Sequence, residues 1–314
     1  MDLLRKYREG SLASAALLRD DLIKLFGGRR LDTRGLESLN GVTTIDSPAP
    51  NRVVFLERFS HDFAEQLAAI KCRSMLFVLT PEYDALTNQP RLVSDAPRTD
   101  YAAIVARLFD YDGTYWHQTT PIHPSAVIGK SAQILPGVVI GRNCSIGADC
   151  LIHPNVVIGP NCRIGANCVI RSGAVIGQPG FGIFRDGAGQ LKHFPHVAGV
   201  VVERCVEIGA LTTISAGSIH PTVVGEFAKI DDHVQIGHNC VIGRRVQLIG
   251  SAVISGSVSV GDDCWIGPNA SVIDAIQIGK GSHIAIGSNV LKSLPEGIVA
   301  FGNPAREVGK AGGS

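Results

Sequence analysis

The chain has 314 residues, of which 45% are hydrophobic, 18% charged and 6% aromatic, and its 29 basic and 28 acidic residues leave a net charge of +1. This apolar content excludes an intrinsically disordered chain, because disordered segments lack the apolar surface that offsets the entropy of ordering. The balanced charge, without a basic block, argues against a nucleic-acid partner. No apolar run reaches the roughly 18 residues of a membrane span, and the first residues lack a signal-peptide core. We therefore expect a cytoplasmic protein of about two domains.

Residues 1–116 are predicted to form a small α/β domain, because helical patterns alternate there with short apolar runs rich in Val, Leu and Phe. A joint to the next domain is expected at 113–121. The predicted helices are 12–28, 61–70 and 98–111, and the predicted strands are 53–57 and 74–79.

A six-residue repeat dominates residues 117–292. An aliphatic residue recurs at every sixth position from Ile122 to Ile176, again from Val202 to Ile214, and from Val224 to Val290, which makes 25 hexads rich in Gly and Asn. A helix would need apolar spacing near 3.6 and would not tolerate this glycine load. Each hexad instead predicts one short strand and a turn, so that three hexads close a triangular coil and the chain forms about eight coils. The aliphatic residues are expected to stack inside this β-helix.

Eight cysteines are present, but none forms the CxxC pair that is typical of zinc sites. Cys144, Cys150, Cys162 and Cys168 are spaced by multiples of six. We expect them to fill a repeated interior position as reduced, apolar side chains, and we predict no metal site.

Two interruptions break the repeat: a long insertion at 178–199 and a slip at 218–222. Long loops on a regular scaffold are commonly functional. His193 and His196 are expected either to bind an anionic group on this insertion or simply to be solvated. Phe181 either shapes a site or anchors the loop. Residues 293–314 are too few for another domain.

His238 is the candidate general base. It follows the inward-facing Ile236 by two residues, so its side chain is expected to point away from the interior. Histidine titrates near neutral pH, as a base requires; the alternative is a solvated corner histidine. Gly256 lies one 18-residue coil further on, and its backbone N–H is expected about 5 Å away along the same face. A base and an N–H donor on adjacent coils suit acyl transfer.

Four segments strengthen this interpretation through a resemblance. These segments resemble the family of UDP-3-O-(3-hydroxyacyl)glucosamine N-acyltransferases of lipid A biosynthesis. The hexapeptide repeat and the order of predicted elements before residue 116 resemble the same family. The segments are GQPGFG (177–182), LKHFPHVAGVVV (191–202), EIGALTTI (207–214) and KIDDHVQIGHN (229–239).

The resemblance implies a left-handed parallel β-helix, a homotrimer, and His238 and Gly256 as general base and oxyanion donor. It implies a nucleotide-linked amino sugar as acceptor, with Phe55 and His61 at the positions that stack on uracil and Asn239 near the substrate. The donor would be an acyl group on acyl carrier protein or coenzyme A, with no permanently bound cofactor.

The chain also departs from that family. The family's Asp-Arg pair after TTI is replaced by Ser215 and Ala216, a second histidine by Ala275, and the uracil-stacking tyrosine by His61. The segment that limits acyl length in that family holds polar Ser288 and Asn289 here, which matches a long alkyl chain poorly and favours a shorter acyl group, such as one on coenzyme A. The family's helical tail is absent, and FGNPAR (301–306) resembles the closing segment of acetyl-CoA-dependent transferases.

We therefore predict an N-acyltransferase that acts on a nucleotide-linked amino sugar in lipid A or surface-glycan synthesis. One alternative is transfer of an acetyl or short acyl group from coenzyme A to a nucleotide sugar for surface polysaccharide. The other is a non-catalytic trimeric scaffold.

Overall fold

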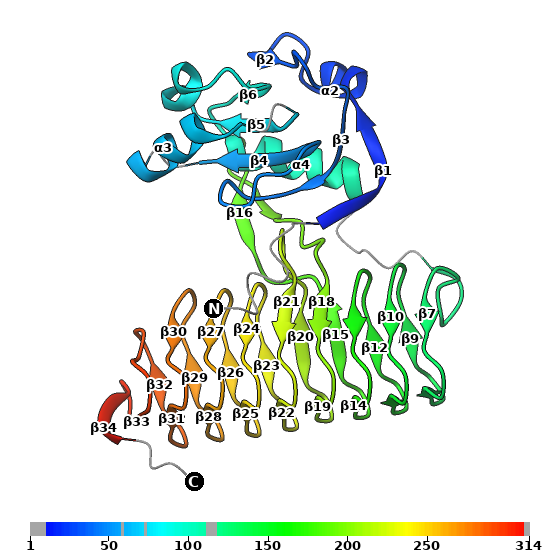
Figure 1. Cartoon of the computed structure of the whole chain (residues 1–314), viewed down its shortest axis with the longest axis vertical. Coiled ribbons are helices and arrows are strands. Elements are labelled where there is room, and N and C mark those ends of the chain that lie inside the picture. Colours follow the sequence, from blue (N-terminus) through cyan, green and yellow to red (C-terminus); the bar gives the residue numbers. More distant parts are fainter. Residues whose placement is uncertain (1–10, 58–59, 72–73, 111–117, 311–314) are drawn as a thin grey trace. The chain divides into compact units, whose positions relative to one another are not determined.

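The computed structural model describes residues 11–57, 60–71, 74–110 and 118–310 (Figure 1). These divide into two compact units, an amino-terminal unit of residues 11–110 with 181–195 and a β-helix unit of residues 118–180 with 196–310. Most of the predicted joint at 113–121 lies outside the described residues. No helix in the described ranges is both long and apolar enough to cross a membrane.

The amino-terminal unit contains a six-stranded sheet in the order β1-β3-β4-β5-β6-β2. Strands β3 to β6 are parallel, and β1 and β2 pair antiparallel at the two edges. The predicted α/β class is confirmed. The elements are β1 (Ser11–Leu18), α2 (Arg19–Phe26), β2 (Leu31–Asp32), β3 (Ser38–Val42), β4 (Arg52–Leu56), α3 (His61–Ala69), β5 (Leu76–Leu79), the 3-10 helix η1 (Pro81–Leu86), β6 (Arg91–Val93) and α4 (Pro97–Phe109).

The helix predicted over 12–28 is wrong in its first half. Residues Ser11–Leu18 form strand β1, which pairs with β3 from Ser11 opposite Val42 to Leu18 opposite Ser38. Only Arg19–Phe26 is helical, and this helix buries Leu22 and Phe26. The Ala- and Leu-rich segment has helical propensity, but pairing with an available sheet edge outweighs it.

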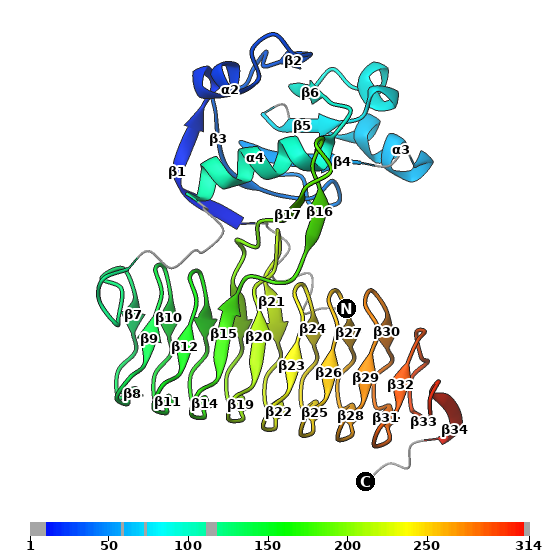
Figure 2. The ribbon, with the colours of Figure 1, turned by 180° about the vertical axis from the view of Figure 1, so that it is seen from behind.

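The repeat region is a left-handed parallel β-helix, as predicted. Three sheets run along it, and strands one coil apart pair in register, for example Ile146 with Ile164 and Ile236 with Ile254. Figures 1 and 2 show the coils stacked in chain order from β7 to β32. The strands are β7 (Val127–Ile128), β8 (Gln133–Ile134), β9 (Val139–Ile140), β10 (Ser145–Ile146), β11 (Leu151–Ile152), β12 (Val157–Ile158), β13 (Arg163–Ile164), β14 (Val169–Ile170), β15 (Val175–Gln178), β18 (Val200–Val202), β19 (Glu207–Ile208), β20 (Thr213–Ser215), β21 (Thr222–Val224), β22 (Lys229–Ile230), β23 (Gln235–Ile236), β24 (Val241–Ile242), β25 (Gln247–Leu248), β26 (Val253–Ile254), β27 (Ser259–Val260), β28 (Trp265–Ile266), β29 (Ser271–Val272), β30 (Gln277–Ile278), β31 (His283–Ile284) and β32 (Asn289–Val290).

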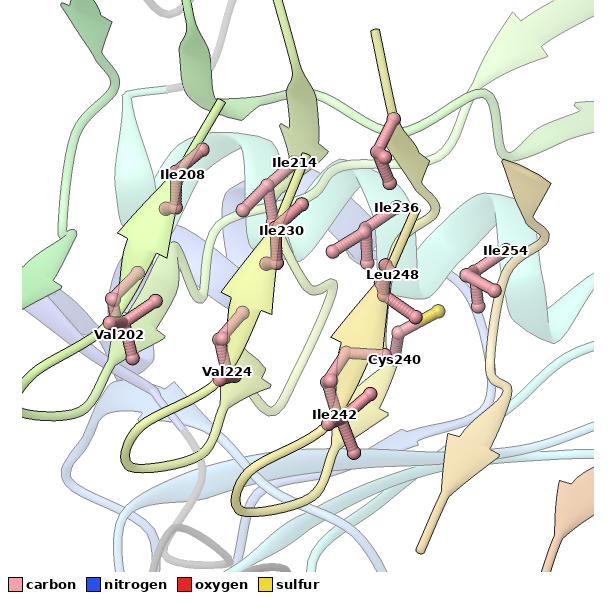
Figure 3. Close-up of a cluster of buried hydrophobic side chains, with 14 of the residues drawn as sticks. Val202, Ile208, Ile214, Val224, Ile230, Ile236, Cys240, Ile242, Leu248 and Ile254 are labelled. Carbon is pink, nitrogen blue, oxygen red and sulfur yellow. The ribbon is translucent and has the colours of Figure 1, made fainter. Parts of the chain in front are cut away.

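The hexad explains both the interior and the corners of the coils. The second residue of each two-residue strand points inward, and these side chains stack into a continuous core (Figure 3). Corner residues adopt positive φ at six-residue intervals, as in Asn155 (+60°), Asn161 (+58°) and Asn167 (+58°). Asn tolerates this left-handed conformation better than most residues do, so the turn chemistry and the apolar period reinforce each other.

The cysteines of the repeat occupy the interior position predicted for them. Cys144, Cys150, Cys162 and Cys168 are at most 2% exposed and are not in disulfides. The Cys144 and Cys150 thiols donate to the carbonyl oxygens of Gly159 and Gly165, each at 3.0 Å. Within the described ranges, no cluster of three His, Cys, Asp or Glu residues is arranged to hold a metal ion.

The 178–199 insertion is not a plain loop. It contains the antiparallel hairpin of β16 (Ile183–Arg185) and β17 (Leu191–His193), and residues 181–195 form part of the amino-terminal unit. A second hairpin, of β33 (Ile298–Phe301) and β34 (Arg306–Lys310), follows the last coil.

Candidate active site

His238 and Gly256 occupy equivalent corners of adjacent coils. Strands β23 and β26 pair Ile236 with Ile254, so the residues two positions later lie one above the other. A Cβ atom built on Gly256 would lie only 2.7 Å from Nε2 of His238. Gly256 does not have a positive φ, so the approach of the imidazole, and not backbone conformation, requires glycine here. The structure therefore brings together the two residues that were predicted to act as a pair.

Asn239 fixes the proton on the half-buried His238 ring. The Asn239 side-chain nitrogen donates to the His220 carbonyl oxygen at 3.4 Å, and its Oδ1 accepts from the backbone N–H and hydroxyl of Ser218 at 3.4 and 3.2 Å. These contacts orient the amide, so the Oδ1 that lies 2.9 Å from His238 Nδ1 must accept from an Nδ1–H. Nε2 then carries the lone pair, on the side that faces Gly256.

The arrangement of His238 and Gly256 matches the needs of acyl transfer. Nε2 is available as a base, and within the described chain no acceptor takes up the N–H of Gly256. A base and an unused backbone donor on the same side can remove a proton and stabilise a tetrahedral oxyanion.

His196 lies beside His238 and not on the loop surface. Its side chain is 1% exposed, and its ring centroid is 4.8 Å from that of His238. The expectation that His196 joins an exposed anion-binding surface is therefore wrong, because an anion has no access to it.

The other insertion residues are exposed in the amino-terminal unit. Phe181 is 85% exposed, and its ring meets that of His193 edge-on at 6.0 Å. His193 is exposed at the end of β17.

Of the positions that depart from the related family, Ser215 and Ala216 are buried, whereas Ala275 is exposed. Ser215 is 9% exposed and Ala216 is 1% exposed, and the Ala216 N–H donates to Gln178 O at 2.8 Å. Ala275 lies on the coil after Gly256, and its N–H donates to Gly256 O at 3.0 Å.

The structure corrects one of the two polar positions, Ser288 and Asn289, predicted to lie along the acyl chain. Ser288 is fully buried, and its hydroxyl accepts the N–H of Gly302 at 3.3 Å. It therefore does not present a polar surface to an acyl chain. The exposed aliphatic side chains of the last coils are those of Ile273 (41%), Ile286 (60%) and Leu291 (56%).

Phe55 belongs to an aromatic cluster in the amino-terminal unit. Its half-buried ring lies 4.5 Å from that of Tyr101 on α4 and 5.9 Å from that of Phe194 on the insertion. Burial raises the pKa of the Tyr101 hydroxyl far above its usual range. His61 is exposed at the first residue of α3.

A cavity of about 350 Å³ lies in the same unit, at the carboxyl ends of β4, β5 and β6. Sequence reasoning missed it, although ligands of parallel sheets commonly bind where strands end and helices begin. Arg98 pairs with Glu57 at 2.5 Å across it. The lining residues are Glu57, Thr80, Asp95, Ala96, Pro97, Arg98, Thr99, Phe184 and Arg185.

Comparisons with known proteins agree with the repeat. Residues 122–150 and 144–178 match the family described as bacterial transferase hexapeptide (six repeats), and residues 257–292 match the hexapeptide repeat of succinyl-transferase. A UDP-N-acetylglucosamine acyltransferase structure from Bacteroides fragilis aligns with a TM-score of 0.55 and 27% identity over 62% of this chain and 74% of that one.

Two curated relatives carry the same name. The UDP-3-O-acylglucosamine N-acyltransferase of Methylobacterium sp. (strain 4-46) is 43% identical over 132 residues, which cover 42% of this chain and 37% of the relative. The UDP-3-O-acylglucosamine N-acyltransferase of Herminiimonas arsenicoxydans is 30% identical over 302 residues, which cover 88% of this chain and 85% of the relative.

Proposed function

The chain belongs to the UDP-3-O-acylglucosamine N-acyltransferase family, and from this premise we propose that it transfers an acyl group from a carrier thioester to the amino group of a nucleotide-linked amino sugar. The observation that carries the proposal is the placement of His238 Nε2 against Gly256, with the opposite ring nitrogen held by Asn239.

The reaction follows from this placement. As the sugar amine attacks the thioester carbonyl carbon, Nε2 of His238 removes one proton from the amine nitrogen. The carbonyl oxygen becomes an oxyanion and accepts the N–H of Gly256. When the tetrahedral intermediate collapses, the C–S bond breaks and the leaving sulfur receives the proton from His238. An amide and a free thiol result.

The amino-terminal unit is the proposed site for the nucleotide. Its cavity has polar side chains of both signs, Glu57 and Asp95 against Arg98 and Arg185, which suit the sugar, base and phosphate groups of such a ligand. Phe55 and His61 remain the proposed contacts for the base, and Phe181 and His193 proposed substrate contacts.

Two thioester carriers are compatible with the proposal, acyl carrier protein and coenzyme A. Of the two polar side chains in the acyl-length segment, Ser288 is buried and so does not favour a short acyl group, whereas Asn289 is half-buried. The segment FGNPAR (301–306), which resembles the closing segment of acetyl-CoA-dependent transferases, supports coenzyme A as the second candidate. We also propose that the protein is cytoplasmic and forms a homotrimer. Light scattering would measure the mass of this assembly in solution.

The test compares His238→Ala with the unchanged protein, using UDP-linked 3-O-acylglucosamine as acceptor and acyl carrier protein and coenzyme A thioesters as separate donors. We expect the variant to lose at least 1,000-fold in transfer rate while its melting temperature stays within about 1 °C. Undiminished transfer by the variant would refute the role of His238. Lack of transfer by the unchanged protein with every donor would favour the scaffold alternative.

Binding measurements identify the substrates independently of turnover. A ligand that binds only the folded state raises the melting temperature, and the stabilisation grows with its concentration relative to Kd. A shift with UDP-sugar and acylated carrier protein supports the lipid A step. A shift with coenzyme A and a different nucleotide sugar supports acylation of a surface polysaccharide.

A further inference from the structure

We propose that His196 is a positioning residue that holds the His238 ring with Nε2 directed at Gly256. The inference rests on the proposed function, because it assigns how the base of that reaction is held. It concerns a residue that the hydrogen-bond network of Asn239 does not include.

The argument starts from the freedom of the His238 ring. Asn239 restrains the ring at one atom, Nδ1, through a single contact of 2.9 Å. Rotation about the Cβ–Cγ bond of His238 has broad energy minima, so a single hydrogen bond at one edge of the ring restrains it weakly. The orientation of the ring then depends on what packs against the opposite edge.

His196 and Gly180 supply that packing. The His196 ring is inclined at 60° to the His238 ring with centroids 4.8 Å apart. A Cβ atom built on Gly180 would lie 2.6 Å from His238 Cβ, 2.8 Å from Cδ2 and 2.9 Å from His196 Nε2. Gly180 therefore lies close beside both side chains, and together with His196 it flanks the Cδ2 side of His238, opposite the side that Asn239 holds.

Burial separates this role from substrate binding. His196 is 1% exposed, whereas His238 is half-buried and Gly256 is partly exposed at the corner. A substrate that reaches Nε2 does not reach His196. Loss of the His196 ring should therefore change how fast bound substrate reacts, and not how tightly it binds.

The chemical reason is the precision that proton transfer needs. Displacement of a reacting group by about 1 Å can lower the rate roughly 100-fold, and loss of an orienting neighbour typically costs 10- to 100-fold. We expect His196→Ala to lower kcat by about 10- to 100-fold with KM for donor and acceptor within about twofold. His196→Gln, which refills most of the volume, should recover most of kcat.

A second variant tests the same pair without emptying it. Gly180→Ala places a methyl group 2.6 Å from Cβ of His238 and 2.9 Å from Nε2 of His196, so both imidazoles must shift, and a melting curve checks that the variant folds. It should also lower kcat about 10-fold at unchanged KM. His283→Ala removes an exposed imidazole on β31 of the same β-helix unit; it is the matched control and should leave kcat within about twofold.

The experiment measures kcat and KM for these variants beside His238→Ala, and records the imidazole nitrogen resonances of His238. In the unchanged protein they should show a proton on Nδ1; in His196→Ala they should show a mixture of tautomers.

Full kcat in His196→Ala and Gly180→Ala, while His238→Ala is inactive, overturns the positioning role and leaves the proposed function intact. A rise in KM at constant kcat likewise overturns it, in favour of substrate binding. Full activity of His238→Ala refutes the proposed function itself.

Discussion

Gly256 combines two requirements in one residue, because its N–H is the proposed oxyanion donor and its missing side chain makes room for the imidazole. We predict that Gly256→Ala lowers kcat at least 100-fold, since a methyl group 2.7 Å from Nε2 must push the ring away from the reacting atoms. A transfer assay with a melting curve measures this. Gly309→Ala is the control, because a Cβ there meets no atom within 4 Å and φ is not positive. An active Gly256→Ala enzyme would contradict the assigned geometry.

We predict that Asn239 supports catalysis by holding the proton on Nδ1 of His238. Asn239→Asp keeps the oxygen that accepts from His238 and Ser218, so its kcat should remain within about fivefold. Asn239→Ala removes that oxygen and should lower kcat by about 10- to 100-fold. Position 239 has φ of +60°, so the melting temperatures of both variants must be compared, and equal kcat values for the two would refute the assignment.

The hairpin of β16 and β17 is part of the amino-terminal unit, although it follows the rest of that unit by more than 70 residues in the chain. Phe194 packs on Phe55 and Tyr101, so Phe194→Ala should destabilise the amino-terminal unit by about 2 kcal/mol. Ellipticity at 222 nm during urea unfolding reports this unit, because every α-helix of the described chain belongs to it. Phe181→Ala, at an 85% exposed position, should change stability by less than about 0.5 kcal/mol. Equal effects would contradict the cluster.

Strand β2 is held to β6 partly by charge. Asp32 accepts from Arg34 and pairs with Arg91 at 3.2 Å, and these guanidinium groups lower the pKa of Asp32 from 3.8 to about 2. A lowered pKa means that the stabilisation is present above about pH 4 and is lost as the pH falls toward 2. Asp32→Asn should therefore cost about 1 kcal/mol at pH 7, and the difference should shrink below pH 4. Urea unfolding at pH 7, 4 and 3 measures it; a difference independent of pH would point to packing.

The β-helix as a whole is stabilised by one continuous core shared between neighbouring coils, so its stability depends on inward and not on outward side chains. Leu248 is fully buried and its neighbour Gln247 is exposed. Leu248→Ala should lower the free energy of unfolding by about 2–5 kcal/mol, and Gln247→Ala by less than about 0.5 kcal/mol. Calorimetric melting distinguishes the two, and a large effect of Gln247→Ala would refute the inward register.

The parts of the molecule that follow from local periodicity could be predicted from the amino-acid sequence alone. A strict hexad with Gly, Asn and Asp at the turns has one regular solution, so the β-helix, the inward aliphatic ladder, the buried cysteines and the adjacency of His238 and Gly256 were all predictable. Residues 18 positions apart in the chain lie at equivalent positions on adjacent coils, and the structure places His238 and Gly256 in this way.

Contacts that depend on pairing between distant or irregular segments could be seen only in the folded structure. Residues 11–18 have helical propensity but form a strand, because the edge of β3 offers hydrogen bonds that no local pattern reveals. Inside the insertion the repeat gives no register, so the burial of His196 against His238 and the packing of Phe194 on Phe55 came from the fold. Local periodicity fixes contacts between repeats, whereas contacts of unrepeated segments depend on which surfaces the rest of the chain leaves open.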